Sequence, residues 1–202
     1  MTIESPAYTV EKKEGDIEIR LYDDYISAHV DLEADYDSAL NKGFRILANY
    51  IFGANHKKSK IKMTAPVTGE NLSDSEKIPM TVPVTEEDTS EKIPMTAPVT
   101  SEEKSKKHVY RISFTMPSKY TIDTLPVPDD DRIKLTEMKN TRAAVINFSG
   151  RAKEKLAQKE INILKSWLKE QNIEPKSNFI VAQYNQPLVP GFMRHNEIIV
   201  KI

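Results

Sequence analysis

The feature of this chain that most constrains its fold is a match between its two halves at a fixed offset of 116 residues, with no gap. At that offset Ile17 corresponds to Ile133, and Ala28 corresponds to Ala144. The match continues through further pairs: Ile19–Leu135, Val30–Ile146, Leu32–Phe148, Leu40–Leu156 and Leu47–Ile163. Shared amphipathic periodicity would also align two similar units in part. A single register through two strand-like segments and a helical one favours an internal duplication.

Periodicity divides each half into the same kinds of element. Two stretches have the apolar spacing of helices, from about Tyr36 to Phe52 and from about Ala152 to Gln171. Segments with the alternation of half-buried strands surround them, at residues 17–21, 26–32, 109–116, 133–138, 143–148, 179–184 and 197–202. Each half therefore reads strand, strand, helix, strand, strand.

This order of elements predicts the fold class. It favours an α+β fold in which an antiparallel sheet curls around a core and the two helices pack outside it. We expect a single domain over residues 1–202, with pseudo-repeat halves at about 8–116 and 132–202.

A second repeat is shorter and sharper. Residues 60–68 read KIKMTAPVT, residues 77–85 read KIPMTVPVT, and residues 92–100 read KIPMTAPVT, with acidic connectors between them. Proline cannot donate a hydrogen bond to a strand ladder, so each copy is predicted to form an edge strand or the arm of a long hairpin. The charged connectors are predicted to be solvated tips.

These motifs resemble the signature of the SOUL family of heme-binding proteins, in which I-x-M-T-x-P-V follows a helix. Three further segments are similar to that family in the same order: Tyr110–Ile133, Ala144–Ala152 and Ala182–Ile198. The resemblance covers nearly the whole chain. It implies a distorted antiparallel β-barrel of duplicated origin flanked by two helices, and binding of heme. Three copies of the motif exceed the one or two that the family suggests, so residues 69–100 are interpreted as an insertion.

Composition excludes several other classes. Basic and acidic side chains number 29 and 30, a balance that gives no electrostatic footprint for nucleic acid. The chain has no cysteine, and no apolar run approaches the roughly 20 residues that span a bilayer. Residues 1–10 lack the pattern of a secretory signal. We therefore expect a soluble cytoplasmic protein with no nucleic-acid or membrane partner, and we favour a monomer.

The first predicted helix has an unusually wide apolar arc. Beside its inward stripe, Phe44, Ala48 and Phe52 extend the arc on one side, and Ile46 and Tyr50 extend it on the other. The polar sector is only roughly 100° wide at 100° per residue. The sheet can cover only part of this arc, so the rest of the apolar surface needs a second cover. Exposed apolar patches often mark binding sites. The cover is either the 69–100 segment or a partner chain, or else a flat apolar ligand on the Phe44 side.

The resemblance also implies where heme would lie. In the family, heme lies on this helix without a strong axial ligand, and basic side chains reach its propionates. The matching positions here are Asn41, Asn49 and Val189, which carry no positive charge. Long cationic side chains can reach a carboxylate from neighbouring positions, and Arg45, Lys57, Lys58 or Arg194 are the candidates. The predicted cofactor-binding set is Asn41, Phe44, Arg45, Ala48, Phe52, Val189 and Arg194.

Histidine and methionine are the remaining candidates to bind iron. His56 follows the first helix and is a weak candidate, so we expect no dedicated metal site. His29 alternates with apolar residues on a predicted strand and is expected to face solvent. Met63, Met80 and Met95 of the repeated motif are expected to be buried apolar residues.

The sequence thus predicts a non-enzymatic protein that binds heme or another porphyrin reversibly, without covalent attachment, and buffers or delivers it. No phosphate loop, H-E-x-x-H or G-x-S-x-G motif is present. One alternative is a small-molecule effector-binding or protein-interaction module without heme, which an empty cleft between the halves would favour. A third is a hydrolase on the same scaffold, which requires a glutamate and a tyrosine to converge in that cleft.

Overall fold

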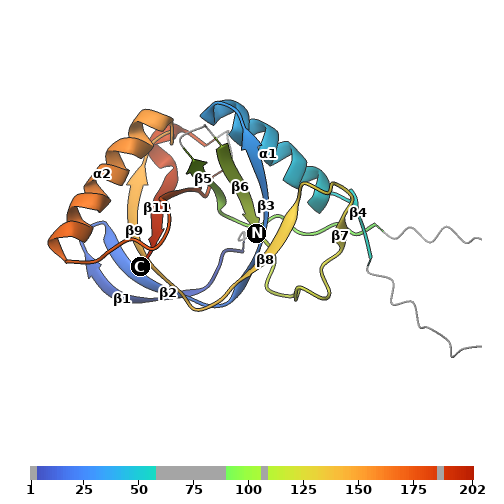
Figure 1. Cartoon of the computed structure of the whole chain (residues 1–202), viewed down its shortest axis with the longest axis horizontal. Coiled ribbons are helices and arrows are strands. Elements are labelled where there is room, and N and C mark those ends of the chain that lie inside the picture. The colour runs from blue at the N-terminus through green and yellow to red at the C-terminus, as the bar shows by residue number, and fades with distance from the viewer. Residues whose placement is uncertain (1–3, 58–89, 106–108, 186–188) are drawn as a thin grey trace, which may run out of the picture.

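The computed structural model describes residues 4–57, 90–105, 109–185 and 189–202. In it, one curled antiparallel sheet carries two helices on its outer side (Figure 1). The first half contains β1 (Tyr8–Glu14), β2 (Ile17–Tyr22), β3 (Tyr25–Glu33), α1 (Tyr36–Ile51), β4 (Asn55–His56), β5 (Val99–Ser105) and β6 (Val109–Thr115). The second contains β7 (Val127–Pro128), β8 (Lys134–Met138), β9 (Thr141–Ser149), α2 (Glu154–Glu170), β10 (Ile180–Gln183), a short 3-10 helix (Gly191–Met193) and β11 (His195–Lys201). The α+β class, the curled sheet and the two outer helices are confirmed.

The order of strands in the sheet has an approximate twofold symmetry. The order is β1-β2-β9-β11-β10-β5-β6-β3-β8, and β4 pairs only with β7. Strands β2 and β3 correspond to β8 and β9 at the 116-residue offset, and after the helix of each half β5 and β6 take the places that β10 and β11 take in the other. Exchange of the two members of each of these four pairs leaves the strand order from β2 to β8 unchanged when it is read from the other end. The first strand of each half pairs with the second strand of the other half, as β2 does with β9 and β8 does with β3. Such an order is what two copies of one unit would form, and the duplication itself stays a prediction.

The hydrophobic cores lie between the sheet and the helices. Alternation along β3 and β9 directs Ala28, Val30 and Ala144 outward to the helices, because neighbouring residues on a strand face opposite sides. Helix α1 packs over β3 and β6, and α2 packs over β9 and β11. A core inside the curled sheet was expected, but the inner, concave face carries only a small apolar cluster of Tyr22, Ala143 and Val145.

Both helices begin and end close to their predicted bounds. Asp35 caps α1, where its side chain accepts a hydrogen bond of 3.0 Å from the backbone nitrogen of Ser38. Helix α1 approaches the sheet closely through Gly43, because a Cβ atom at that position would lie 2.5 Å from Ile112 Cγ1. Apolar spacing and a close helix–sheet contact thus place one side of α1 firmly on the sheet.

The third copy of the short motif corrects the edge-strand prediction. It leads into β5, which lies in the middle of the sheet between β10 and β6. Pro98 comes just before the strand, so its missing donor does not interrupt the ladder. Ile93 is buried, but Met95 is 38% exposed, so the expectation of burial is wrong for that methionine. The first two copies, with Met63 and Met80, lie outside the described residues.

Candidate functional site

One side of the wide apolar arc on α1 is covered by the chain that crosses between the halves. Tyr50 is fully buried, and its hydroxyl donates a hydrogen bond of 2.8 Å to the backbone oxygen of Pro126. Leu125 and Ile133 from the same crossing segment join the core beneath α1. The Ile46–Tyr50 side of the helix therefore has a protein cover.

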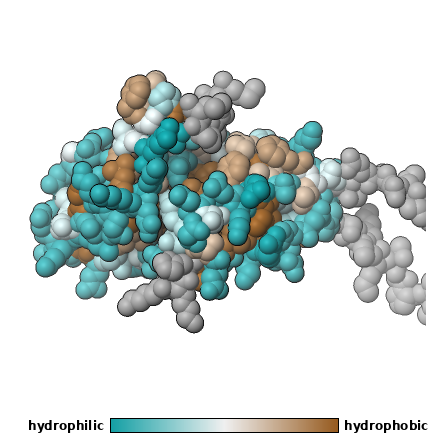
Figure 2. Space-filling view, turned by 90° about the horizontal axis from the view of Figure 1, so that it is seen from above, coloured by the Kyte–Doolittle hydropathy of each residue, from teal (hydrophilic) through white to brown (hydrophobic). Residues whose placement is uncertain are grey.

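The opposite side of α1, which we call the α1 flank, keeps two aromatic rings at the surface. Phe44 is 37% exposed and Phe52 is 59% exposed, whereas Ala48 between them is buried. The Phe44 ring is held edge-on to Phe114, with ring centroids 5.4 Å apart. Hydrophobic side chains are visible on the half of the molecule where α1 lies (Figure 2). The flank is a shallow apolar strip with a small residue at its centre.

The polar candidates on α1 lie beside this strip. Asn41 and Arg45 are exposed, and spacings of three and four residues place them along the same side of the helix as Phe44, Ala48 and Phe52. The Asn41 side chain donates to the backbone oxygen of Asp37 at 2.9 Å. No ion pair engages Arg45 within the part of the chain that the structure describes. The structure thus brings five of the seven predicted residues together.

The other two predicted residues lie on a separate loop. Val189 and Arg194 belong to the connection between β10 and β11, and Arg194 Nε donates to the backbone oxygen of Val189 at 2.8 Å. Gly191 in the same loop lies near Arg151, just before α2. Their role in binding stays a prediction.

His56 lies on β4, just past the C-terminal end of α1. Its Nδ1 is 2.8 Å from Asp129 Oδ1, and both side chains are about half exposed. This contact leaves Nε2 as the nitrogen that can bind a metal. Within the described residues, no group of three or more histidine, cysteine, aspartate or glutamate side chains is placed to hold a metal ion.

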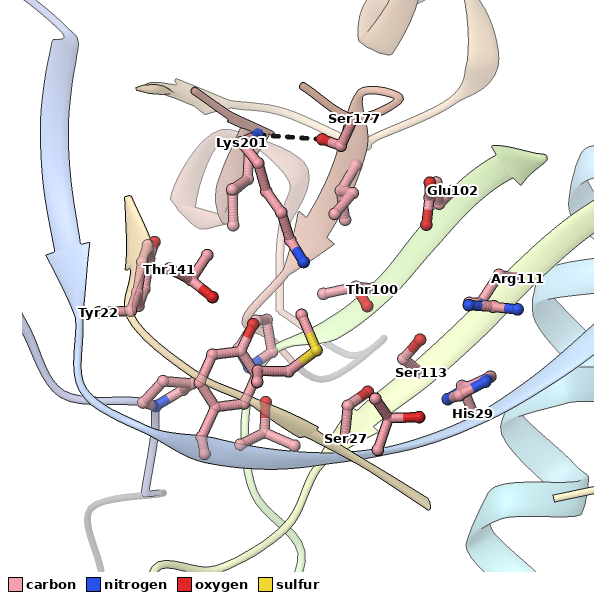
Figure 3. Close-up of a pocket in the computed structure, with 18 of the residues that line it drawn as sticks. Tyr22, Ser27, His29, Thr100, Glu102, Arg111, Ser113, Thr141, Ser177 and Lys201 are labelled. Atoms are coloured by element: carbon pink, nitrogen blue, oxygen red, sulfur yellow. Dashed lines mark hydrogen bonds between the residues drawn. The ribbon is translucent and has the colours of Figure 1, made fainter. Parts of the chain in front are cut away.

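A second candidate site lies on the concave face, between the two halves. It is a cavity of about 290 Å³, lined by strands of both halves (Figure 3). His29 lies in this lining and is only 6% exposed, so the expectation that it faces solvent is wrong. Burial, together with the Arg111 cation, lowers the pKa of His29, which favours the neutral ring. The polar face of β3 is therefore the inner wall of a cavity.

A buried ion cluster occupies the concave face beside the cavity. Arg20 forms ion pairs of 2.6 Å with Glu18 and 2.9 Å with Glu197. Tyr184, which lines the cavity, donates a hydrogen bond of 2.5 Å to Glu197. Burial alone would raise the pKa of Glu197, but a hydrogen bond from His195 and the Arg20 guanidinium outweigh it and lower that pKa.

A glutamate and a tyrosine therefore converge at this cleft, as the hydrolase hypothesis requires. Their chemistry does not suit proton transfer near neutral pH, because a general base works best when its pKa is close to the operating pH. Glu197 is ion-paired with a lowered pKa, and burial raises the pKa of Tyr184. The arrangement is that of a structural ion pair.

The curled sheet, the exposed α1 flank and the concave cavity together are features of a ligand-binding domain. The family model described as "SOUL heme-binding protein" matches residues 3–201. The chain belongs to the SOUL heme-binding protein family.

Two known proteins with similar sequences are also named as heme-binding proteins. The chain is 29% identical to heme-binding protein 2 of Homo sapiens over 187 residues, which is 91% of this chain and 77% of that protein. It is 44% identical to heme-binding protein 2 of Mus musculus over 61 residues, 29% of each chain. These names describe a binding protein rather than an enzyme.

Solved structures support the fold alone. A hydrolase from Listeria innocua matches with a TM-score of 0.54 at 12% identity, over 94% of this chain and 93% of that one. A protein of the same organism described as uncharacterized and conserved matches with a TM-score of 0.53 at 10% identity, over 92% of this chain and 91% of that one.

Among the described residues, no helix is long and apolar enough to span a membrane.

Proposed function

We propose that this protein binds heme or another tetrapyrrole reversibly on the α1 flank and buffers or delivers it. The observation that carries the proposal is the pair of exposed rings, Phe44 and Phe52, on either side of the small residue Ala48. Exposed apolar side chains that share one side of a helix can mark a binding site. The family to which the chain belongs adds the kind of ligand.

The side chains of the flank fit the parts of such a ligand. Phe44 and Phe52 offer aromatic surface to a flat macrocycle, and Ala48 lets the macrocycle approach the helix backbone. Arg45 supplies a cation with a long side chain for a propionate, and Asn41 supplies an amide beside it. Val189 and Arg194 are proposed to contribute from their loop, and His56 stays a weak candidate for an iron ligand. Heme bound there supplies the iron and the light absorption by which binding is detected.

The strength of these contacts accounts for reversibility. Phe44 and Phe52 are 37% and 59% exposed, which together is about one fully exposed phenylalanine, so their burial contributes roughly 1.5–3 kcal/mol. A hydrogen bond to a charged group adds about 1.5–3 kcal/mol. Micromolar affinity requires about 8 kcal/mol, so the flank is suited to a ligand that binds and leaves.

A hemin titration of the purified protein, followed by the Soret band, tests the site. We expect a saturable one-to-one shift, and Phe44→Asp is expected to weaken it by roughly tenfold or more, since it places a charge in the apolar strip. Ile163→Asp is the matched control, because Ile163 is 41% exposed on α2. Unchanged affinity in Phe44→Asp, or an equal loss in Ile163→Asp, would sink the site assignment.

Delivery is tested by mixing the hemin-loaded protein with excess apomyoglobin. Transfer is expected to go to completion at a rate that does not depend on the apomyoglobin concentration, because dissociation from the shallow site limits it. Retention of hemin by this protein would contradict a buffering or delivery role.

A second candidate function is a small-molecule effector-binding or protein-interaction module without heme. The concave cavity between the halves favours it, since an internal cleft of this kind is not needed for binding on α1. A hemin titration with no saturable Soret shift would leave this module as the better account.

A further inference from the structure

The lining of the concave cavity changes character from one end to the other. Strand register places Tyr25 beside Met138 at one end and His29 beside Ser113 in the middle. Two strand positions further on, Asp31 pairs with Arg111. Tyr22 adds aromatic surface at the first end, where its ring centroid lies 6.4 Å from that of Tyr25. The cavity thus has an aromatic, apolar end and a charged end.

Most charges at the charged end are already paired. Arg111 forms two hydrogen bonds of 2.7 Å with the Asp31 carboxylate. Lys104 forms an ion pair of 2.9 Å with Glu102. His29 favours its neutral form, as described above. These groups together contribute no net charge.

Lys201 is the exception. Its side chain points from β11 into the cavity (Figure 3), and its backbone nitrogen is fixed by a hydrogen bond of 3.0 Å to Ser177 Oγ. Among the residues that the structure describes, no carboxylate forms an ion pair with its ammonium group. The charged end of the cavity therefore carries a net charge of about +1, supplied by a half-buried lysine.

The ammonium group of Lys201 is partly desolvated. Burial lowers its pKa, while Glu102 partly opposes that shift and Lys104 adds to it. A desolvated ammonium group gains most from an anion placed beside it. Hydroxyl groups of Thr100, Ser113 and Thr141 in the same lining can hydrogen-bond such an anion.

We propose that this cavity is a second binding site, specific for a small carboxylate with an aromatic or apolar body, whose carboxylate pairs with Lys201. The body of the ligand lies toward Tyr22, Tyr25 and Met138. A volume of 290 Å³ equals that of about ten water molecules, which sets the size of the ligand at a single ring with a short acidic arm. The site uses none of the α1 flank residues, so it stands whether or not heme binds there.

NMR titration of the full chain with phenylacetate tests this site, with phenylacetamide as the neutral probe of the same shape. Phenylacetate is expected to shift amide signals of β3, β5, β6 and β11 around the cavity. Phenylacetamide is expected to bind roughly tenfold more weakly or worse, because it lacks the charge that pairs with Lys201.

Variants separate this site from the flank. Lys201→Met is expected to lower phenylacetate affinity roughly tenfold or more, while Lys159→Met, which removes an exposed lysine on α2, leaves it unchanged. Phe44→Asp is also expected to leave phenylacetate binding unchanged. If Lys201→Met fails to fold, Lys201→Gln is the substitute. Equal affinity for the two probes, or shifts confined to surfaces outside the cavity, would overturn the proposal.

Discussion

The two halves of the curled sheet are built on one plan but fill their concave sides differently. At the 116-residue offset, Ser27 and His29 on β3 correspond to Ala143 and Val145 on β9. The second pair belongs to the small apolar cluster on the concave face, whereas the first pair lines the cavity. The two pairs are similar in total size, so at these positions the halves differ in polarity rather than in bulk.

Strands β2 and β8, which correspond to each other at the same offset, differ in the bulk of one side chain. Arg20 on β2 corresponds to Thr136 on β8. Arg20 is 2% exposed and fills its side of the concave face with ion pairs, whereas Thr136 lines the cavity. The concave face is therefore filled by an ion cluster around Arg20 and stays open around Thr136 and the other residues that line the cavity.

Removal of the arginine is the largest expected effect. Arg20→Met removes the buried cation that pairs with Glu197, while Glu18 keeps its ion pair with Lys13. Loss of one partner of a buried pair costs about 3–5 kcal/mol. Urea unfolding at pH 7 measures this loss. The counterpart change Thr136→Val is expected to stay within about 0.5 kcal/mol, since it touches no buried charge. Comparable losses in the two variants would remove the contrast between the halves.

The pH dependence of the unfolding free energy of Arg20→Met tests the same ion cluster more sharply. In the wild type the pKa of Glu197 is lowered on folding, so its stabilisation is present above the unfolded value of 4.5 and is lost as pH falls through the folded pKa. In Arg20→Met, burial is expected to raise that pKa instead. The variant should therefore recover part of its deficit between pH 7 and pH 5, and a deficit that grows over this range would contradict the account.

The next largest loss of stability is expected where α1 approaches the sheet closely. Gly43→Ala places a Cβ atom against Ile112 on β6 and is expected to cost about 1–3 kcal/mol by overpacking. At the 116-residue offset Gly43 corresponds to Lys159, whose side chain is 70% exposed. Lys159→Ala is expected to be neutral within about 0.5 kcal/mol. Thermal unfolding of the two variants decides whether only the first helix packs through a glycine.

The smallest expected change is in the pH dependence of stability that His29 causes. Its pKa is lowered by burial, so the unfolded chain binds more protons just below pH 6.5 and stability falls as pH drops through that range. His29→Gln removes this dependence, and its counterpart Val145 has none. The loss of unfolding free energy between pH 8 and pH 5 is expected to shrink by about 1 kcal/mol or less in the variant. An unchanged loss would show that His29 does not titrate as a buried group.

Both helices and most of the longer strands could be read from the sequence because they depend on local spacing. Strand β1 was not predicted, because all seven of its residues are exposed and it has no buried face. The helix predicted from Tyr36 to Phe52 spans Tyr36–Ile51, and the one predicted from Ala152 to Gln171 spans Glu154–Glu170. The place of each strand in the sheet depends on pairing between distant segments. The proline motif that leads into β5 was predicted to form an edge strand or the arm of a long hairpin, and β5 lies in the middle of the sheet, paired antiparallel with β6.

Only part of the candidate site could be predicted from the sequence in the same way. Helical spacing alone places Asn41, Phe44, Arg45, Ala48 and Phe52 along one side of α1. The position of the Val189–Arg194 loop cannot be derived from spacing. The concave cavity was missed because alternation shows that Ser27 and His29 share a face, but only the curvature of the sheet makes that face an enclosed wall. Lys201, which directly follows the apolar run of residues 198–200 in β11, was the available signal.

The central claim is that a tetrapyrrole binds on the α1 flank. Paramagnetic hemin broadens amide signals close to it, so spectra of the protein with and without hemin map the site directly. Broadening is expected to centre on residues 41–52 of α1, while signals of β3 and β11 on the concave face stay sharp. Broadening centred on the concave cavity, or spread evenly over the surface, would contradict the account.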